Sequence, residues 1–298
     1  MATVAILGPG AVGGLLAVRL GQAGHDVTLI GRNPGGVTVA GLTLTAPGAA
    51  AVTTRPASRP YLTQPVEFLI VAVKATQLID ATARVPAAFT AGATVVPFLN
   101  GVDHVPYLRA VYPADTVAGT IVVEATKLAD GTIEQATPSA TITLAATPAA
   151  AAPRGAPPAT AAESAARLLG VPGLDVTTQP GEEQVLWRKL CMLACYALLT
   201  TAAEQPIGAA REKFADWVGP LAREACAAAA VHGASVDPAA VEAQIRGLPG
   251  EGRSSMLKDR LAGRELELDA IAGPTLRTLG PAGAPVTLRA VEAITGAR

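Results

Sequence analysis

The stretch Val4-Ala-Ile-Leu-Gly8-Pro-Gly10-Ala-Val-Gly13-Gly14 decides how the beginning of this chain folds. A short apolar run ends in Gly-x-Gly-x-x-Gly, and an amphipathic helical pattern follows it. In such a turn Gly8 permits a tight strand-to-helix connection, Gly10 lets a pyrophosphate approach the backbone, and Gly13 lets the helix pack close to the strand. The order strand, glycine turn, helix therefore indicates a phosphate-binding turn.

The helix after this turn presents free backbone N–H groups at its start, at Ala11 and Val12, together with the positive end of its dipole. A second strand, residues 26–30, follows at the spacing of a βαβ unit. We therefore expect an α/β protein whose N-terminal domain binds a dinucleotide and is of the Rossmann type. A plain glycine turn in an α/β protein without a cofactor is the alternative.

The composition fits a two-domain protein with a core of small side chains. The chain has 298 residues, of which 50% are hydrophobic and only 3% aromatic. The formal net charge of −1 gives no indication of nucleic acid as a partner. Three cysteines are an odd and sparse set, typical of a reducing compartment. We interpret Cys191 and Cys195 as small buried hydrophobes rather than as metal or redox groups, and the scattered histidines predict no metal site.

Targeting signals are not evident, and we expect a soluble, cytoplasmic protein that does not bind a membrane. Met1 leads directly into a strand, without the basic and apolar segments of a signal peptide. The longest apolar run, residues 190–203, is too short to cross a bilayer and suits a buried core helix.

The pattern changes from mixed strands and helices to helices alone near Pro180-Gly181. Residues 67–74 read as a strand buried on both faces, residues 93–99 as a further strand, and residues 174–178 as a last strand. From Glu182 onward, long apolar helical runs replace the strand signals. We predict a dinucleotide-binding domain over residues 1–180 and an all-α substrate and catalytic domain over residues 181–298.

Polar residues follow three of the predicted strands, at the edge where ligands bind in parallel sheets. After the second strand stands Arg32, with no acidic residue beside it, which favours the 2′-phosphate of NADP over the 2′-hydroxyl of NAD. Lys74 is placed for a phosphate or a carboxylate, and Asn100-Gly101 could aim an amide at a ligand. Surface cations and an ordinary Asn-Gly turn are the alternatives.

In the helical half, Lys189 opens a face that is otherwise apolar. Lys189, Leu193 and Ala197 stand at i, i+4 and i+8, on one face of a helix. A partly desolvated lysine can have a lowered pKa and act as a proton donor near neutral pH. A lysine that extends from the helix end to solvent is the alternative.

A second polar cluster lies further along, in Ser254-Ser255-Met256-Leu-Lys-Asp259 and Arg264-Glu265-Leu-Glu267-Leu-Asp269. Either serine is a natural helix N-cap, and a serine at a helix start can also hold a carboxylate. We expect Glu267 to lie within a helix and to point inward, where it needs a partner.

Together these residues resemble the ketopantoate reductases (2-dehydropantoate 2-reductases), and the resemblance covers essentially the whole chain. The motifs occur in the family's order: Gly8-x-Gly10-x-x-Gly13, Arg32, Val73-Lys74-Ala-x-Gln77, Asn100-Gly101, Trp187-x-Lys189, Ser254-Ser255-Met256-x-x-Asp259 and Glu267-x-Asp269. As a set they are far more specific than any one of them alone.

The resemblance implies that NADPH passes hydride to the keto carbon of a 2-oxo acid, with ketopantoate as the default substrate, in pantothenate biosynthesis. Lys189 would be the general acid that protonates and stabilises the developing alkoxide. Glu267 would hydrogen-bond a substrate hydroxyl, Ser255 would bind the substrate carboxylate, and Asn100 would lie near Lys189 and the nicotinamide.

The family's cofactor contacts transfer to the first half of the chain. By resemblance, Arg32 and Lys74 would hold the 2′-phosphate of NADP, with Gln77 near the adenosine. Family members occur as monomers and dimers, so a homodimer is possible.

The chain departs from the family pattern after the lysine, where asparagines normally stand at the fourth and eighth positions. Here these positions hold Leu193 and Ala197. Loss of two amides should weaken discrimination by hydrogen bonding and favours a more apolar 2-oxo acid, ketone or imine as an alternative substrate. A dinucleotide-binding protein that has lost catalysis is the third hypothesis.

Overall fold

The computed structural model describes residues 1–32, 41–146 and 160–296, which form two compact units. The first unit consists of Met1–Leu99 and His104–Val185. The second, called the helical unit below, consists of Asn100–Asp103 and Leu186–Arg298. Four residues that follow a strand of the first unit therefore belong structurally to the helical unit.

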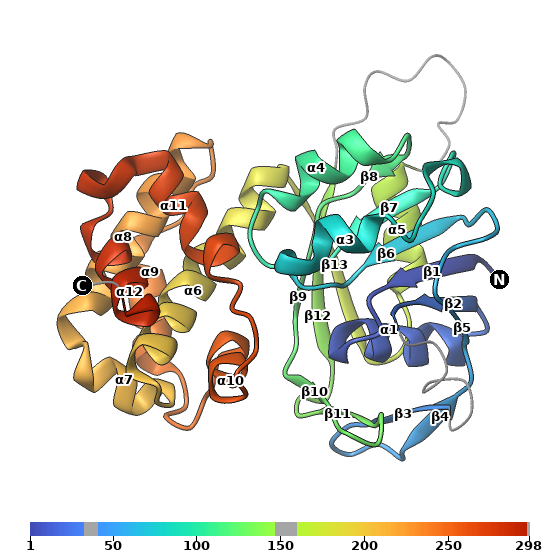
Figure 1. The fold of residues 1–298 in the computed structure, drawn as a ribbon, viewed down its shortest axis with the longest axis horizontal. Helices are drawn as coiled ribbons and strands as arrows, with labels where there is room; N and C mark the ends of the chain where they lie inside the picture. The colour runs from blue at the N-terminus through green and yellow to red at the C-terminus, as the bar shows by residue number, and fades with distance from the viewer. Residues whose placement is uncertain (33–40, 147–159, 297–298) are drawn as a thin grey trace. The chain divides into compact units, whose positions relative to one another are not determined.

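The first unit is built on a parallel sheet with the strand order β5-β2-β1-β6-β7-β8 (Figure 1). Its strands are β1 (Thr3–Leu7), β2 (Asp26–Ile30), β5 (Ala57–Arg59), β6 (Phe68–Val71), β7 (Thr94–Pro97) and β8 (Asp115–Thr116). The central strands β6 and β7 are buried along their whole length, as expected from their apolar sequence. The parallel sheet with flanking helices confirms the predicted α/β, Rossmann-type fold of this half.

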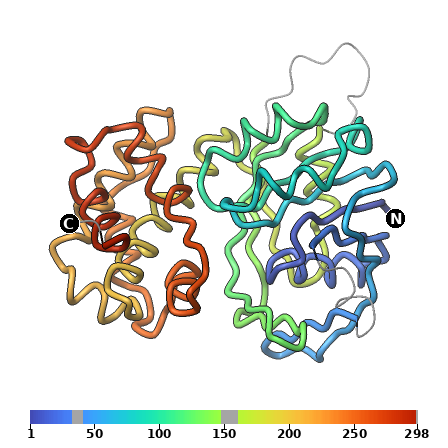
Figure 2. The backbone as a smooth tube through the Cα atoms, viewed as in Figure 1, coloured from blue at the N-terminus to red at the C-terminus, as the bar shows by residue number. Residues whose placement is uncertain are grey.

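Two smaller sheets complete the strands of the first unit, and their chain path can be followed in Figure 2. One has the order β10-β11-β3-β4, from Ala125–Lys127, Ile133–Gln135, Leu42–Thr45 and Val52–Thr54. The other has the order β13-β12-β9, from Leu174–Pro180, Ala140–Ala146 and Gly119–Val122. Helices of this unit are α1 (Ala11–Gln22), α3 (Leu78–Thr82), α4 (His104–Val111), α5 (Ala161–Leu169) and the 3₁₀ turns η1 (Ala75–Gln77) and η2 (Ala87–Phe89).

The helical unit begins within α6, and four of its other helices pack on α8 (Ala215–Val231). Its helices are α6 (Glu182–Ala203), α7 (Ile207–Lys213), α8 (Ala215–Val231), α9 (Pro238–Gly247), α10 (Ser255–Leu261), α11 (Leu268–Gly283) and α12 (Pro285–Thr295). Small residues dominate its core: many of its buried residues are alanines, and Cys191, Cys195 and Cys226 are buried with them. The all-α second half and the buried cysteines are as predicted.

Helix α6 is longer than the apolar run that the sequence suggested. With 22 residues it is long and apolar enough to cross a membrane by length and composition alone. However, 67% of its most apolar window is buried inside the protein, as in the core helix of a soluble domain. Its apolar surface therefore has packing partners within the chain.

The structure corrects the expectation that Glu267 lies within a helix. Helix α10 ends at Leu261, because Gly263 adopts a φ of +63° and the backbone N–H of Arg264 turns back to the carbonyl of Asp259. Helix α11 begins only at Leu268. Glu267 is the residue before its first turn, and it points inward with only 5% exposure, as predicted.

Candidate active site

The glycine turn connects β1 to α1 in the way the motif requires. Gly8 has a φ of +104°, and a Cβ there would lie 2.8 Å from the backbone nitrogen of Val73. A Cβ on Gly13 would lie only 2.0 Å from the carbonyl oxygen of Gly8. Backbone therefore packs against backbone at both positions, which leaves no room for any other residue.

Gly10 differs from these two because its Cβ direction is open. It is the N-cap of α1, and a Cβ there would meet no atom within 4 Å. The Cβ direction of Gly10, directly before the N–H groups of Ala11 and Val12, is thus clear of protein. This open cradle at a 12-residue helix fits the pyrophosphate of a dinucleotide.

The strand order places the predicted cofactor residues at one edge of the sheet. Strand β1 lies between β2 and β6, so Arg32 and Lys74 follow the two strands that flank the glycine turn. Arg32 is exposed, whereas Lys74 is half-buried and its backbone carbonyl accepts a hydrogen bond from the backbone N–H of Gln77 (2.9 Å). Arg32 and Lys74 thus follow the carboxyl ends of two strands of the sheet, where ligands bind in parallel sheets.

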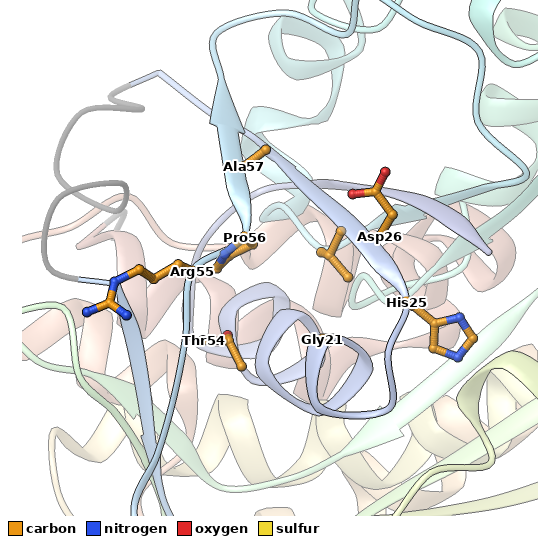
Figure 3. A pocket seen from close by; sticks show the side chains of 8 residues that line it. Gly21, His25, Asp26, Thr54, Arg55, Pro56 and Ala57 are labelled. Atoms are coloured by element: carbon orange, nitrogen blue, oxygen red, sulfur yellow. The ribbon is translucent and has the colours of Figure 1, made fainter. Parts of the chain in front are cut away.

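A hollow of about 200 Å³ lies at the opposite edge of the same sheet (Figure 3). It is lined by residues that precede or begin β2 and β5, among them His25, Asp26 and Ala57. It therefore opens at the amino ends of the strands and is separate from the glycine turn.

In the helical unit, Lys189 is half-buried on the second turn of α6. Burial lowers the pKa of its ammonium group from 10.5 to about 8, and the Glu267 carboxylate acts in the opposite sense. The desolvation effect is the larger. A lysine in this state is mostly protonated at neutral pH but can release its proton readily, as a general acid must.

Asn100 and Glu267 are in direct contact. The side-chain amide of Asn100 donates to Oε2 of Glu267 at 3.1 Å. The neighbouring Gly101 approaches α11 so closely that a Cβ would lie 2.6 Å from the carbonyl oxygen of Ala270. The structure thus brings together Lys189, Glu267 and Asn100, which are widely separated in sequence.

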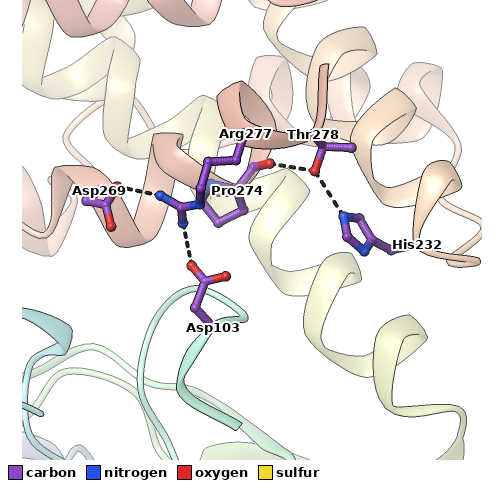
Figure 4. Close-up of polar contacts among 6 residues, drawn as sticks. All are labelled: Asp103, His232, Asp269, Pro274, Arg277 and Thr278. Atoms are coloured by element: carbon purple, nitrogen blue, oxygen red, sulfur yellow. Dashed lines mark hydrogen bonds and ion pairs between the residues drawn. The ribbon is translucent and has the colours of Figure 1, made fainter. Parts of the chain in front are cut away.

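An arginine links the two segments that carry Asn100 and Glu267 (Figure 4). Arg277 on α11 donates to the carboxylate of Asp103 and, at 2.6 Å, to that of Asp269. Asp103 ends the four-residue segment that begins with Asn100, and Asp269 lies two residues after Glu267. On the other face of α11, Thr278 contacts His232, whose ring stacks on Trp187.

The two serines of α10 have different roles. Ser254 is buried and caps the helix by accepting from the N–H of Leu257, and its hydroxyl also contacts that of Thr200 at 2.7 Å. Ser255 is exposed. Only Ser255 therefore offers a hydroxyl to a ligand.

The two residues at the positions of the family's asparagines differ in accessibility. Leu193 is half-buried, whereas Ala197 is fully buried in the core of the helical unit. Of the two substitutions, only Leu193 leaves an accessible apolar surface.

Two family models match this chain, one over its first part and one over its helical part. The family model described as ketopantoate reductase PanE/ApbA matches residues 4–149, and the model of the C-terminal part of the same family matches residues 183–290. The chain belongs to the ketopantoate reductase family. It is thus an oxidoreductase of a dinucleotide-dependent family, and the resemblance drawn from its motifs is confirmed.

Individual proteins that are similar to this chain match it over nearly its whole length. A 2-dehydropantoate 2-reductase of Caulobacter vibrioides is 30% identical over 285 residues, covering 93% of this chain and 92% of the relative. Among solved structures, a dimeric ketopantoate reductase from Staphylococcus aureus superposes with a TM-score of 0.80 at 19% identity, covering 99% of both chains. A D-mandelate dehydrogenase bound to NADH and anilino(oxo)acetate superposes with a TM-score of 0.82 at 21% identity, covering 99% of this chain and 97% of that one.

Several residues that shape the site could not be found from the sequence. Thr200 holds Ser254, Arg264 pairs with the buried Asp259 at 2.8 Å, and Arg277 bridges two aspartates. The exception is the pair of Arg277 with Asp269, since these residues and Gly273 between them stand four apart on one face of α11. The contacts of Thr200 with Ser254 and of Arg277 with Asp103 join distant segments and leave no local pattern.

Proposed function

We propose that this chain is an NADPH-dependent reductase of 2-oxo acids, with reduction of ketopantoate to pantoate as its first candidate reaction. The observation that supports this most strongly is the group of Lys189, Glu267 and Asn100. It provides a lysine poised to give up a proton near neutral pH, next to a carboxylate held by an amide. In this proposal residues 1–180 hold the dinucleotide and residues 181–298 carry the substrate and most of the catalytic groups.

When bound, the nicotinamide cofactor supplies the hydride for the keto carbon. As the carbonyl oxygen gains negative charge, Lys189 stabilises that charge and transfers its proton to the oxygen. Glu267 keeps the ammonium group charged and accepts a hydrogen bond from a substrate hydroxyl. Asn100 holds Glu267 in place through its amide, and Ser255 binds the substrate carboxylate.

The cofactor preference is also a proposal. Arg32 and Lys74 supply two positive charges on either side of the glycine turn, and no acidic residue follows β2 at Arg32. Such an arrangement supports recognition of the 2′-phosphate of NADPH, with Gln77 near the adenosine.

The test is NADPH oxidation with ketopantoate, followed by absorbance, for the wild-type chain and Lys189→Ala. We expect turnover in the wild-type protein and its collapse in the variant, with NADPH binding retained. Wild-type protein that binds NADPH but turns over no 2-oxo acid would refute the proposal and favour a binding protein without catalysis.

A second candidate substrate class is a more apolar 2-oxo acid, ketone or imine. The accessible apolar surface of Leu193, where the family pattern has an amide, is the observation that favours it. The comparison is kcat/KM for ketopantoate against 2-oxo acids with aromatic or branched side chains. A large preference for ketopantoate would reject this candidate.

We extend the proposal to the setting in which the enzyme works. It would act in the cytoplasm on a free small molecule, without nucleic acid or membrane, and would form a homodimer, as the Staphylococcus aureus relative does. Sedimentation of the purified chain tests the dimer.

A further inference from the structure

A lysine that no motif marks lies against the glycine turn of the first unit. Lys127 is the last residue of β10, and its Nζ donates to the carbonyl oxygen of Pro9 at 2.8 Å. Pro9 stands between Gly8 and Gly10, directly before the start of α1. The ammonium group is therefore held beside the open cradle described above.

The small sheet that carries Lys127 is fixed to the first turn of α1. Lys127 pairs with Ile133 in the antiparallel ladder of β10 and β11. A Cβ on Gly14 would lie 2.9 Å from Cδ1 of Ile133, so the helix and β11 are in close contact at this point. The backbone position of Lys127 is thus set by the packing of these two elements, and its hydrogen bond to Pro9 places the ammonium group.

The electrostatics of this position are unfavourable for a cation alone. The start of α1 carries the positive end of the helix dipole, which disfavours a neighbouring positive charge. Lys127 is half-buried, burial lowers the pKa of its ammonium group, and no carboxylate of the described residues forms an ion pair with it. Its hydrogen bond to Pro9 leaves two N–H donors for another group.

The glycine turn does not need Lys127 for its shape. Pro9 packs on Gly31, where a Cβ would lie 2.6 Å from the proline ring, and Gly8 donates to the carbonyl of Ile30 at 3.0 Å. These contacts already hold both sides of the turn in place. A purely structural role therefore does not explain why Lys127 lies beside it.

We propose that Lys127 binds the pyrophosphate of the dinucleotide, as a positive charge added to the N–H groups at the start of α1. The inference rests on the proposed dinucleotide site and deepens it. Because NADH and NADPH share the pyrophosphate, Lys127 contributes equally to both. Arg32 and Lys74 differ from Lys127 because the proposed function assigns them to the 2′-phosphate, which only NADPH has.

The experiment measures dissociation constants of NADPH and NADH by calorimetry for the wild-type chain, Lys127→Met and Lys127→Arg. Loss of one charge-assisted contact to phosphate should weaken both cofactors by about tenfold or more in Lys127→Met, by the same factor for each. The effect should shrink in high salt. Lys127→Arg, which keeps the charge, should stay within about threefold of wild type.

Two control variants distinguish a pyrophosphate contact from a 2′-phosphate contact and from a change in net charge. Arg32→Gln should weaken NADPH and leave NADH unchanged, and Lys213→Met, which removes an exposed charge from the helical unit, should change neither. A Tm measurement of each variant without cofactor reports on folding. Three results would overturn the role of Lys127. They are cofactor affinities in Lys127→Met that equal those of wild type, a loss of affinity for NADPH alone, and a loss of affinity that is accounted for by a fall in Tm. Wild-type protein that binds neither cofactor would instead refute the proposed function itself.

Discussion

The candidate site of the first unit is formed by backbone groups, whereas that of the helical unit is formed by side chains. In the first unit, one continuous turn of backbone, Gly8 to Gly13, forms the cradle, whose N–H groups we propose to bind the dinucleotide. In the helical unit, three side chains from distant segments, Asn100, Lys189 and Glu267, meet at one place. The backbone site tolerates no added Cβ at Gly8 or Gly13, whereas the side-chain site depends on the charge and position of each group.

The largest effect should come from removing the proton donor of the side-chain site. Lys189→Met should lower kcat by about 10³-fold, because it removes both a general acid and the charge that stabilises the alkoxide. Cofactor affinity should stay unchanged. Lys213→Met, an exposed lysine of the same unit, is the matched control and should keep wild-type activity. Equal losses in the two variants would mean that Lys189 acts only through net charge.

Two alanine substitutions test the backbone site. Gly13→Ala should reduce the free energy of unfolding by about 3 kcal/mol or more, since its Cβ would overlap the carbonyl oxygen of Gly8. Gly10→Ala should leave Tm unchanged, because its Cβ direction is open in the free protein, yet weaken dinucleotide binding by about tenfold or more. Thermal unfolding and calorimetry measure the two effects. Full NADPH affinity in Gly10→Ala would show that the pyrophosphate does not occupy this cradle.

Glu267→Gln should alter the pH dependence of the side-chain site. The carboxylate raises the pKa of Lys189, so its removal lowers that pKa below about 8 and reduces the protonated fraction at a given pH. The fall of kcat/KM with rising pH should therefore begin at a lower pH in the variant. Asn100→Ala, which keeps the carboxylate, serves as the comparison. It should lower kcat, but the pH at which kcat/KM begins to fall should move less than in Glu267→Gln.

The smallest effect is expected for the arginine between the two segments. The side chains of Arg277, Asp103 and Asp269 are each about half exposed or more, so each ion pair is weak. Arg277→Met should lower kcat by about two- to fivefold through misplacement of Asn100 and Glu267, with little change in Tm. Arg289→Met, an exposed arginine of α12, should leave kcat unchanged. If Arg277→Met has wild-type kinetics, the contacts of Arg277 with Asp103 and Asp269 are surface ion pairs that do not position the site.

The same contrast shows how much the sequence could predict. The glycine turn, its flanking strands and the long helices follow from local periodicity and turn chemistry, so the fold was predictable. The inward direction of Glu267 was also predicted, but its position outside a helix depends on Gly263 and on the contact of Arg264 with Asp259. Contacts such as Lys127 with Pro9 join segments 118 residues apart, and no local pattern encodes them.

The sharpest test of a partly desolvated Lys189 as the proton donor is the pH dependence of kcat/KM for oxo acid reduction at saturating NADPH. A lysine whose folded pKa is lowered to about 8 is protonated below that pH and loses its proton above it. We predict a plateau at neutral pH and a tenfold fall per pH unit above about pH 8, absent in Lys189→Met. A rate that stays constant to about pH 10 in the wild-type enzyme, near the ordinary pKa of lysine, would contradict this role.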